Sequence, residues 1–258
     1  MKPKLPPLCL FILSFFVVAF CRAQMIQLGL KGGLSLPNLS SVRGVSDVSK
    51  GYKTISGPDF ALFADYPLSD IFSLETDLEW STQGGQKSGL QTIPASPDLS
   101  QFFPQGTQYL YANFTSIVKL QYILLPIMLK YNKELGGSGN WKLYLDGGVF
   151  GGLLVTANAS ASGSSKVYLD KGLTQPLASV TVNFDSTGNI KNQLHQGNFG
   201  IEGNLGLLYQ MNQKGVFAEV GGNYGLIDLQ KNSLNGINHT GALIIRVGFF
   251  IYINYKER

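Results

Sequence analysis

The sequence predicts an all-β protein, an eight-stranded antiparallel up-and-down transmembrane β-barrel with long extracellular loops. Three observations predict this fold. Eight segments alternate between apolar and polar residues, and the connections between them alternate between short and long. Charged residues make up 14% of the chain, against about a quarter in typical soluble proteins. Nevertheless, no stretch after residue 23 is apolar for long enough to form a membrane helix.

The N-terminus has the pattern of an export signal. Two lysines precede an apolar run over residues 8–20, and residues 21–23 form a small-x-small cleavage site. The run of about 13 residues is shorter than the roughly 20 that a membrane helix needs. We therefore expect residues 1–23 to be a signal peptide and residues 24–258 to form the barrel domain, with lipidation of Cys21 as an open alternative. Because Cys9 and Cys21 both lie in the signal, the mature protein would contain no thiol.

The strands are predicted from a period of two, because successive side chains of a β-strand point to opposite faces. In residues 71–81, for example, apolar side chains alternate with serines and three acidic residues. Comparable segments lie at residues 24–35, 59–66, 71–81, 116–131, 141–156, 196–211, 216–228 and 240–255. Most are longer than the five or six residues usual in globular proteins. These longer segments reach the length of about 9 to 11 residues that a tilted strand needs to cross a bilayer.

The connections predict which end of the barrel faces outward. Tight or short connections lie at residues 67–70, 132–140 and 212–215, whereas longer ones lie at residues 36–58, 85–115, 157–195 and 229–239. Outer-membrane barrels have short turns on the periplasmic side and long loops on the extracellular side. This alternation therefore predicts a barrel in the outer membrane, with residues 36–58 as its first extracellular loop.

Aromatic residues mark the ends of the predicted strands, as expected for the aromatic belts at the two membrane interfaces. The periplasmic belt would contain Tyr66, Phe72, Tyr131, Trp141, Tyr209, Phe217 and Tyr255. The extracellular belt would contain Phe60, Trp80, Phe199 and Tyr224.

The inward faces of the strands carry charged residues. An eight-stranded barrel is barely wide enough to hold its own side chains, so we expect no open pore. Charges removed from bulk water need partners, which predicts a structural network of ion pairs inside the barrel. Its expected members are the acids Glu75, Asp77, Glu79, Glu202 and Glu219 and the bases Lys31, Lys119, Lys142 and Arg246.

No catalytic residue, cofactor site or metal site is predicted. The alternative of an enzyme at the extracellular rim depends on His195 and His239, with Asp228 and several serines nearby, but no catalytic motif flanks them. The histidines also lack a metal-ligand spacing such as His-x-x-x-His. Loss of the signal peptide removes three basic residues and no acid from a chain of net charge +4. No basic patch is left to predict nucleic-acid binding.

Several short motifs along the mature chain resemble the PorT-like outer-membrane β-barrel family of Bacteroidota, also described as porin-family proteins. They are residues 28–34 (LGLKGGL), 64–70 (ADYPLSD), 72–75 (FSLE) followed by 83–85 (QGG), 125–131 (LPIMLKY) and 223–226 (NYGL). The resemblance implies the fold and the outer-membrane location, and it carries over no functional residue. The family's namesake is an accessory barrel of type IX secretion and gliding. In contrast to most such barrels, this chain ends on residues 256–258 (KER) rather than on an aromatic residue.

These observations lead us to expect a non-enzymatic barrel with a structural or binding role carried out by its extracellular loops. An accessory role in a type IX secretion or gliding apparatus is one alternative, and a soluble lipid-binding barrel or a rim enzyme is another. The expected partners are outer-membrane lipid, the barrel-insertion machinery during biogenesis and a protein partner at the loops. We expect a monomer.

Overall fold

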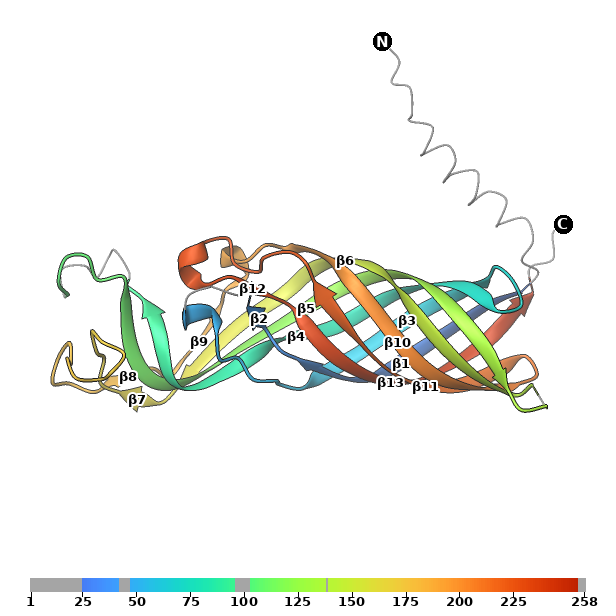
Figure 1. Cartoon of the computed structure of the whole chain (residues 1–258), viewed down its shortest axis with the longest axis horizontal. Helices are drawn as coiled ribbons and strands as arrows, with labels where there is room; N and C mark the ends of the chain where they lie inside the picture. The colour runs from blue at the N-terminus through green and yellow to red at the C-terminus, as the bar shows by residue number, and fades with distance from the viewer. Residues whose placement is uncertain (1–24, 42–46, 96–102, 138, 255–258) are drawn as a thin grey trace, which may run out of the picture.

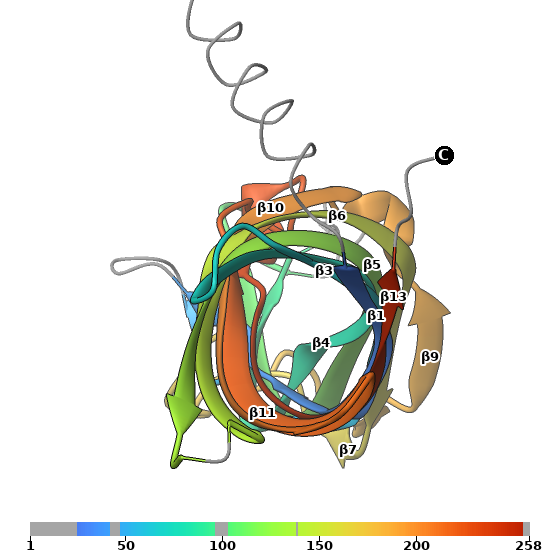
Figure 2. The same cartoon turned by 90° about the vertical axis from the view of Figure 1, so that its right-hand side faces the viewer.

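Eight antiparallel strands close into one barrel in the computed structural model, which describes residues 25–41, 47–95, 103–137 and 139–254 (Figure 1). The predicted signal peptide lies outside these residues. The strands are β1 (Met25–Pro37), β3 (Gly57–Pro67), β4 (Phe72–Pro94), β5 (Tyr109–Leu135), β6 (Trp141–Ser162), β10 (Gly197–Met211), β11 (Lys214–Gly225) and β13 (Gly241–Asn254). Each strand pairs with the next in this order, and β13 pairs with β1 to complete the ring (Figure 2). The predicted fold class is confirmed.

The two ends of the barrel differ as the connection lengths predict. At one end, here called the turn end, β10 and β11 are joined through Asn212 and Gln213 alone. Asn212 has a positive φ of 50°, a conformation that asparagine tolerates better than most residues. β1 begins and β13 ends at this same end (Figure 1). The opposite end, here called the loop end, carries all the long connections.

Three strands continue past the point where the sequence predicts loops. β4 extends to Pro94 and β5 begins at Tyr109, so much of the predicted loop 85–115 is a paired hairpin. β6 similarly extends to Ser162. Residues in these extensions do not alternate regularly between apolar and polar, as in the run of Tyr109 to Thr115 on β5, although their backbone pairing continues. No helix in the described part of the chain is long and apolar enough to cross a membrane.

The loop end also holds short elements. Antiparallel pairs join β2 (Ser40–Ser41) to β12 (Asn238–His239) and β7 (Ser164–Ser165) to β8 (Val182–Asn183), while β9 (Ser186–Asn189) adds to the edge of β6. Single 3₁₀ turns lie at η1 (Asp47–Ser49), η3 (Lys191–Gln193) and η4 (Ser233–Asn235). The predicted loops are therefore largely structured.

Apolar side chains cover the outer wall of the barrel, and charged ones lie inside it. Val247 is 66% exposed on the outer wall, whereas Arg246 beside it in sequence is 1% exposed and faces the lumen. A soluble lipid carrier needs the reverse arrangement, so that alternative is wrong. Outward aromatics pair at the turn end, Phe72 with Tyr131 and Trp141 with Tyr209, at ring distances of 5.5 and 4.8 Å.

One member of the predicted periplasmic belt is wrong, and another is not tested. Phe217 is 7% exposed and faces the lumen, because its neighbours Val216 and Ala218 occupy the outward positions of β11. Tyr255 lies outside the described residues.

Five large inward rings fit the narrow lumen because each of them lies over a glycine on a neighbouring strand. A Cβ on Gly206 would lie 2.1 Å from the ring of Tyr144, and one on Gly248 would lie 2.2 Å from the ring of Phe217. The same arrangement pairs Gly29 with Phe63, Gly200 with Phe150 and Gly215 with Phe250. Glycine at these positions makes the close approach of ring and backbone possible.

Candidate functional site

The middle of the lumen contains an unusual concentration of buried charge. Eight acidic and three basic side chains are each no more than 5% exposed. They are Asp59, Asp65, Glu75, Asp77, Glu79, Asp146, Glu202 and Glu219, with Lys31, Lys130 and Arg246. We call these eleven residues the lumen network. Because burying a charge is costly unless it is paired, their contacts decide whether the barrel interior is stable.

Arg246 on β13 links carboxylates from four other strands. Its Nε donates to Asp59 Oδ1 at 2.6 Å, and its Nη2 lies 2.8 Å from Glu79 Oε2. Its Nη1 donates to Glu202 and Glu219, at 3.2 and 3.3 Å. The four acids come from β3, β4, β10 and β11, so a single guanidinium connects opposite walls of the barrel.

Two lysines join the remaining acids to this centre. Lys31 Nζ lies 2.8 Å from Glu75, 2.7 Å from Asp77 and 3.4 Å from Glu219. Lys130 Nζ contacts Glu75 Oε2 and lies 3.1 Å from Asp65. Glu75 and Glu219 are therefore shared between cations, which makes the network continuous.

Neutral side chains extend the network at its edges. The Tyr144 hydroxyl donates to Glu219 Oε2 at 2.6 Å, and Asn204 Nδ2 donates to Asp146 Oδ1 at 2.8 Å. Ser81 donates to Asp59 at 2.9 Å. Asn204 thus gives a polar partner to Asp146, which has no ion pair in the described part of the chain.

Seven of the nine predicted interior residues come together in the lumen network: Lys31, Glu75, Asp77, Glu79, Glu202, Glu219 and Arg246. The prediction is wrong for Lys119, which is exposed and shares the outward face of β5 with Ile123. It is also wrong for Lys142, which lies at the turn end, 3.6 Å from the exposed Glu134.

Four members of the network were not predicted: Asp59, Asp65, Lys130 and Asp146. The signal for Lys130 was present in the sequence, because residues 127, 129 and 131 are apolar and alternate with it. The same rule of alternation places Asp59 and Asp146 on the inward face, because their neighbours Phe60 and Leu145 are apolar and face outward.

Apolar side chains close the lumen below the network, at the turn end. Phe63, Tyr144, Leu208, Phe217 and Phe250 form one buried cluster, with Tyr252 packed against it. The rings of Phe63 and Phe217 meet edge to face at 5.5 Å. Lys130 Nζ lies 4.2 Å from the centre of the Tyr144 ring, so the aromatic cluster directly underlies the charged layer.

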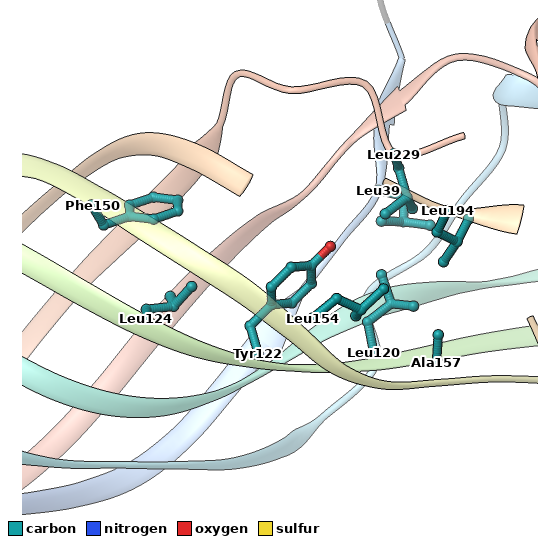
Figure 3. Close-up of a cluster of buried hydrophobic side chains, with 9 residues drawn as sticks. All are labelled: Leu39, Leu120, Tyr122, Leu124, Phe150, Leu154, Ala157, Leu194 and Leu229. Carbon is teal, nitrogen blue, oxygen red and sulfur yellow. The ribbon is translucent and has the colours of Figure 1, made fainter. Parts of the chain in front are cut away.

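A second apolar cluster closes the lumen at the loop end. Its members on β5 and β6 are Leu120, Tyr122, Leu124, Phe150, Leu154 and Ala157. Three leucines from three different loops, Leu39, Leu194 and Leu229, pack against them (Figure 3). All three are 4% exposed, so the loops themselves form the lid of the barrel.

The loops that supply this lid are fastened to one another. Asn238 is fully buried and donates from Nδ2 to the carbonyl oxygens of Ser40 and Ser49, while its backbone N–H donates to Gln230 Oε1. Lys171 donates to Asp47 at 2.8 Å across 124 residues of sequence. The lid and the loops around it therefore form one structured unit. We call its described residues, 38–41, 47–56, 82–95, 103–119, 157–196 and 226–240, the loop cap.

The two histidines of the predicted rim site both contact Asp228. His195 Nδ1 lies 2.7 Å from the Asp228 backbone oxygen, and His239 Nε2 lies 3.3 Å from its carboxylate. Tyr224 stacks on His239 at 5.8 Å. No serine side chain in the described residues hydrogen-bonds to either ring. Nor does a group of three or more histidine, cysteine or acidic side chains with metal-binding geometry occur there.

Comparison with protein families identifies the barrel. The family model described as "Outer membrane protein beta-barrel domain" matches residues 22–231, which is most of the chain. No curated protein sequence matches.

Solved outer-membrane barrels are similar at low identity. Neisserial surface protein A is 13% identical, with 88% of this chain and 96% of that chain covered and a TM-score of 0.37. The N-terminal β-barrel domain of Pseudomonas aeruginosa OprF is 13% identical, covering 90% and 98%, with a TM-score of 0.38. The outer membrane protease OmpT from Escherichia coli is 11% identical, covering 90% and 98%, with a TM-score of 0.33. Similarity at this level carries no argument about function.

Proposed function

Because the chain belongs to the outer membrane protein β-barrel domain family and lies in the outer membrane, we propose that it is a closed, non-enzymatic barrel that anchors a binding surface formed by its loop cap. The observation that carries this proposal is the filled lumen. A charged layer centred on Arg246 occupies its middle, and apolar clusters close it at both ends.

A pore through this lumen would require several costly changes at once. An ion would have to displace Leu39, Leu194 or Leu229 from the lid, then separate Arg246 from its carboxylates, then pass the aromatic cluster around Phe217. Separating a buried charge from its partner costs about 3–5 kcal/mol by itself. The side chains therefore support an anchoring role for the barrel and leave the loop cap as the surface available for contacts.

The proposal of a non-enzymatic role is supported by the contacts of the two histidines. His195 and His239 each connect a loop segment to Asp228, which gives them a structural reason to be present. Replacing both by glutamine is expected to leave any lipid or peptide turnover of the purified protein unchanged. A loss of turnover in this variant would instead assign catalysis to the rim.

The finer family resemblance supports a second candidate function. The PorT-like motifs over residues 64–70 and 125–131 suggest an accessory component of a type IX secretion and gliding apparatus of Bacteroidota. Deleting the gene and measuring exported protein tests this role, since normal export would remove it from consideration. The loop cap would then be the contact surface for the apparatus.

The proposal also covers how the chain reaches the membrane. Residues 1–23 would be removed as a signal peptide, and the barrel-insertion machinery would fold residues 24–258 as a monomer. N-terminal sequencing of the membrane-inserted protein, heat-dependent gel migration and mass measurement in detergent test these three points separately.

The closed barrel is tested by conductance. Purified protein in a planar lipid bilayer is expected to show no stepwise current above the bilayer background. A matched variant, in which Leu39, Leu194 and Leu229 are all replaced by serine, would show whether the lid alone holds the barrel closed. Stable current steps from the wild-type protein would refute the proposal.

A further inference from the structure

The loop cap has an excess of positive charge. Its described part contains Lys50, Lys53, Lys87, Lys119, Lys166, Lys171, Lys191 and Lys231. It contains four acidic residues, Asp47, Asp170, Asp185 and Asp228, and no glutamate. The lumen below it carries the opposite imbalance, with eight acids and three bases. The basic residues of the mature protein are therefore concentrated on the surface that faces outward.

All four aspartates of the cap are already used to hold the loops together. Asp170 accepts hydrogen bonds from the backbone of Thr174 and Gln175 and from the Thr174 hydroxyl. Asp185 accepts from the Gly163 N–H at 2.9 Å. Asp228 pairs with His239, and Asp47 pairs with Lys171. These contacts fix the four carboxylates in place, and eight lysines against four aspartates leave the described cap with a net charge of +4.

Half of the lysines, by contrast, have no partner for their amines. Within the described residues, the side chains of Lys53, Lys119, Lys166 and Lys191 make no hydrogen bond or ion pair. Lys53, Lys119 and Lys166 are exposed, and Lys191 is half-buried. A surface with a net positive charge and unpaired amines attracts anions.

Although the sequence predicts no basic patch in the mature protein, the fold brings lysines that are distant in sequence together where the first loop meets β4 and the third loop. Lys50 and Lys171 lie 3.7 and 2.8 Å from Asp47, so two cations share one carboxylate. Lys87 contacts the Val48 carbonyl oxygen and lies 4.4 Å above the Tyr52 ring. Lys53 pairs through its backbone with Gln86, the residue before Lys87. Two lysines thus share Asp47, and two more, Lys53 and Lys87, belong to the backbone that adjoins it.

We propose that the loop cap binds an anionic polysaccharide carrying sulfate or phosphate groups. This inference rests on the proposed function, since it names the partner of the same surface. Lysine ammonium groups are compact point charges that suit sulfate and phosphate without planar recognition. The lysines lie on separate loops, and Lys166 follows β7, which is at the far loop end of the molecule (Figure 1). A polymer can reach such separated charges together, whereas a lipid headgroup can reach only those near the membrane.

Two features of the described cap argue against a nucleic acid. Phe114 and Phe184 stack on each other at 4.6 Å, so neither ring presents a free face between them. Single-stranded nucleic acids are held by bases stacked on open aromatic rings. The described cap also contains no arginine, the residue that most often reads bases.

The test uses the full chain in zwitterionic nanodiscs with fluorescent dextran sulfate as probe and unsulfated dextran as control. Binding is expected at an ionic strength of about 0.01 M, where the Debye length is about 30 Å, and it should be lost at about 1 M, where that length is about 3 Å. Unsulfated dextran should not bind. Absence of dextran sulfate binding at low salt would overturn the inference.

Two matched triple variants separate a specific surface from net charge. Replacing Lys53, Lys166 and Lys191 by glutamine removes three unpaired cap amines and is expected to weaken dextran sulfate binding at least tenfold. Replacing Lys133, Lys142 and Lys214 by glutamine removes the same charge at the turn end and should leave binding unchanged. Equal weakening by both variants would show that only net charge matters and would refute the site.

Two further arms identify the source of the anion. Binding to vesicles that contain anionic lipid, without binding to dextran sulfate, would assign the surface to lipid instead. Equal affinity for duplex DNA of comparable charge would also overturn the choice of a polysaccharide. Conductance measured on the same preparation distinguishes failure of this inference from failure of the proposed function. Current through the barrel would refute the closed barrel, whereas failure to bind dextran sulfate would refute only this inference.

Discussion

Replacing Arg246 by methionine removes the centre of the lumen network while keeping a long side chain in its place. The guanidinium is 1% exposed and contacts Asp59, Glu79, Glu202 and Glu219 at 2.6 to 3.3 Å. The variant would leave four buried carboxylates from four strands without the cation that they share. We expect the barrel to be strongly destabilised.

The expected loss follows from the contacts. Three of them are hydrogen bonds to carboxylates, and each bond to a charged group contributes about 1.5–3 kcal/mol. Leaving a single buried charge unpaired costs about 3–5 kcal/mol. The sum of the three hydrogen bonds and the cost of one unpaired charge overlap near about 5 kcal/mol. These are two estimates of the same loss, because neighbouring interactions in one network are not independent.

Urea unfolding from lipid vesicles measures the loss. Trp80 and Trp141 lie on the outward face of the barrel, so their fluorescence reports the exchange of lipid for water. Lys119→Met is the matched control, because it removes a basic side chain that is exposed, and it should change the free energy of unfolding by no more than about 0.5 kcal/mol. Adding Glu79→Gln and Glu202→Gln to the Arg246→Met variant should restore part of the loss. An Arg246→Met protein within about 1 kcal/mol of the wild type would refute the structural role of the network.

Three other changes probe different parts of the molecule. Tyr144→Phe removes the 2.6 Å hydrogen bond to Glu219 and should lower the free energy of unfolding by about 1.5–3 kcal/mol in the same urea assay. Gly206→Val places a Cβ 2.1 Å from the Tyr144 ring and should cost about 3 kcal/mol or prevent heat-modifiable gel migration, whereas Gly151→Ala, which meets nothing within 4 Å, should be neutral. The hydrogen bond and charge of Lys171 lower the pKa of Asp47. The contact between Asp47 and Lys171 should therefore stabilise the joined loops at any pH above the ordinary pKa of an aspartate, and this stabilisation should be lost as the pH falls through the lowered pKa of Asp47. Spin-label distances between the first and third loops should therefore lengthen in strong acid and, in Asp47→Asn, already at neutral pH; unchanged distances in both cases would exclude this contact as the link between the loops.

The sequence predicts the barrel well because its membrane-level strands obey a simple alternation. Outward residues must be apolar in lipid, so inward positions follow by counting from any apolar residue. Applied strictly, that count places Lys130 inside and Lys119 outside, because Lys119 shares its face with Ile123. The error at Lys119 came from selecting it for its charge, whereas Lys142 has an inward position in the alternation and is outside the network because it lies at the turn end of β6.

Other features could not be read from the alternation. Beyond the membrane the outward face of a strand need not be apolar, so the extension of β4 to Pro94 carries no regular alternation. The partners of Arg246 depend on which walls face each other across the closed lumen, which is set by the stagger of all eight strands. The lid also escapes prediction, because Leu39, Leu194 and Leu229 come from three loops far apart in the sequence and meet only when the loops fold over the barrel.

The position of Arg246 in the chain gives the lumen network a role in barrel closure. It lies on β13, the last strand, whereas three of its four carboxylate partners lie on β3, β4 and β10, which do not pair with β13. Until β13 pairs with β1, Asp59, Glu79 and Glu202 therefore lack the guanidinium that they share in the finished barrel. A shift of β13 by one residue would turn Arg246 toward lipid and leave all of these acids unpaired. The network thus favours one register and one closed form above the alternatives, which explains why a barrel with no open pore would keep so many charges inside.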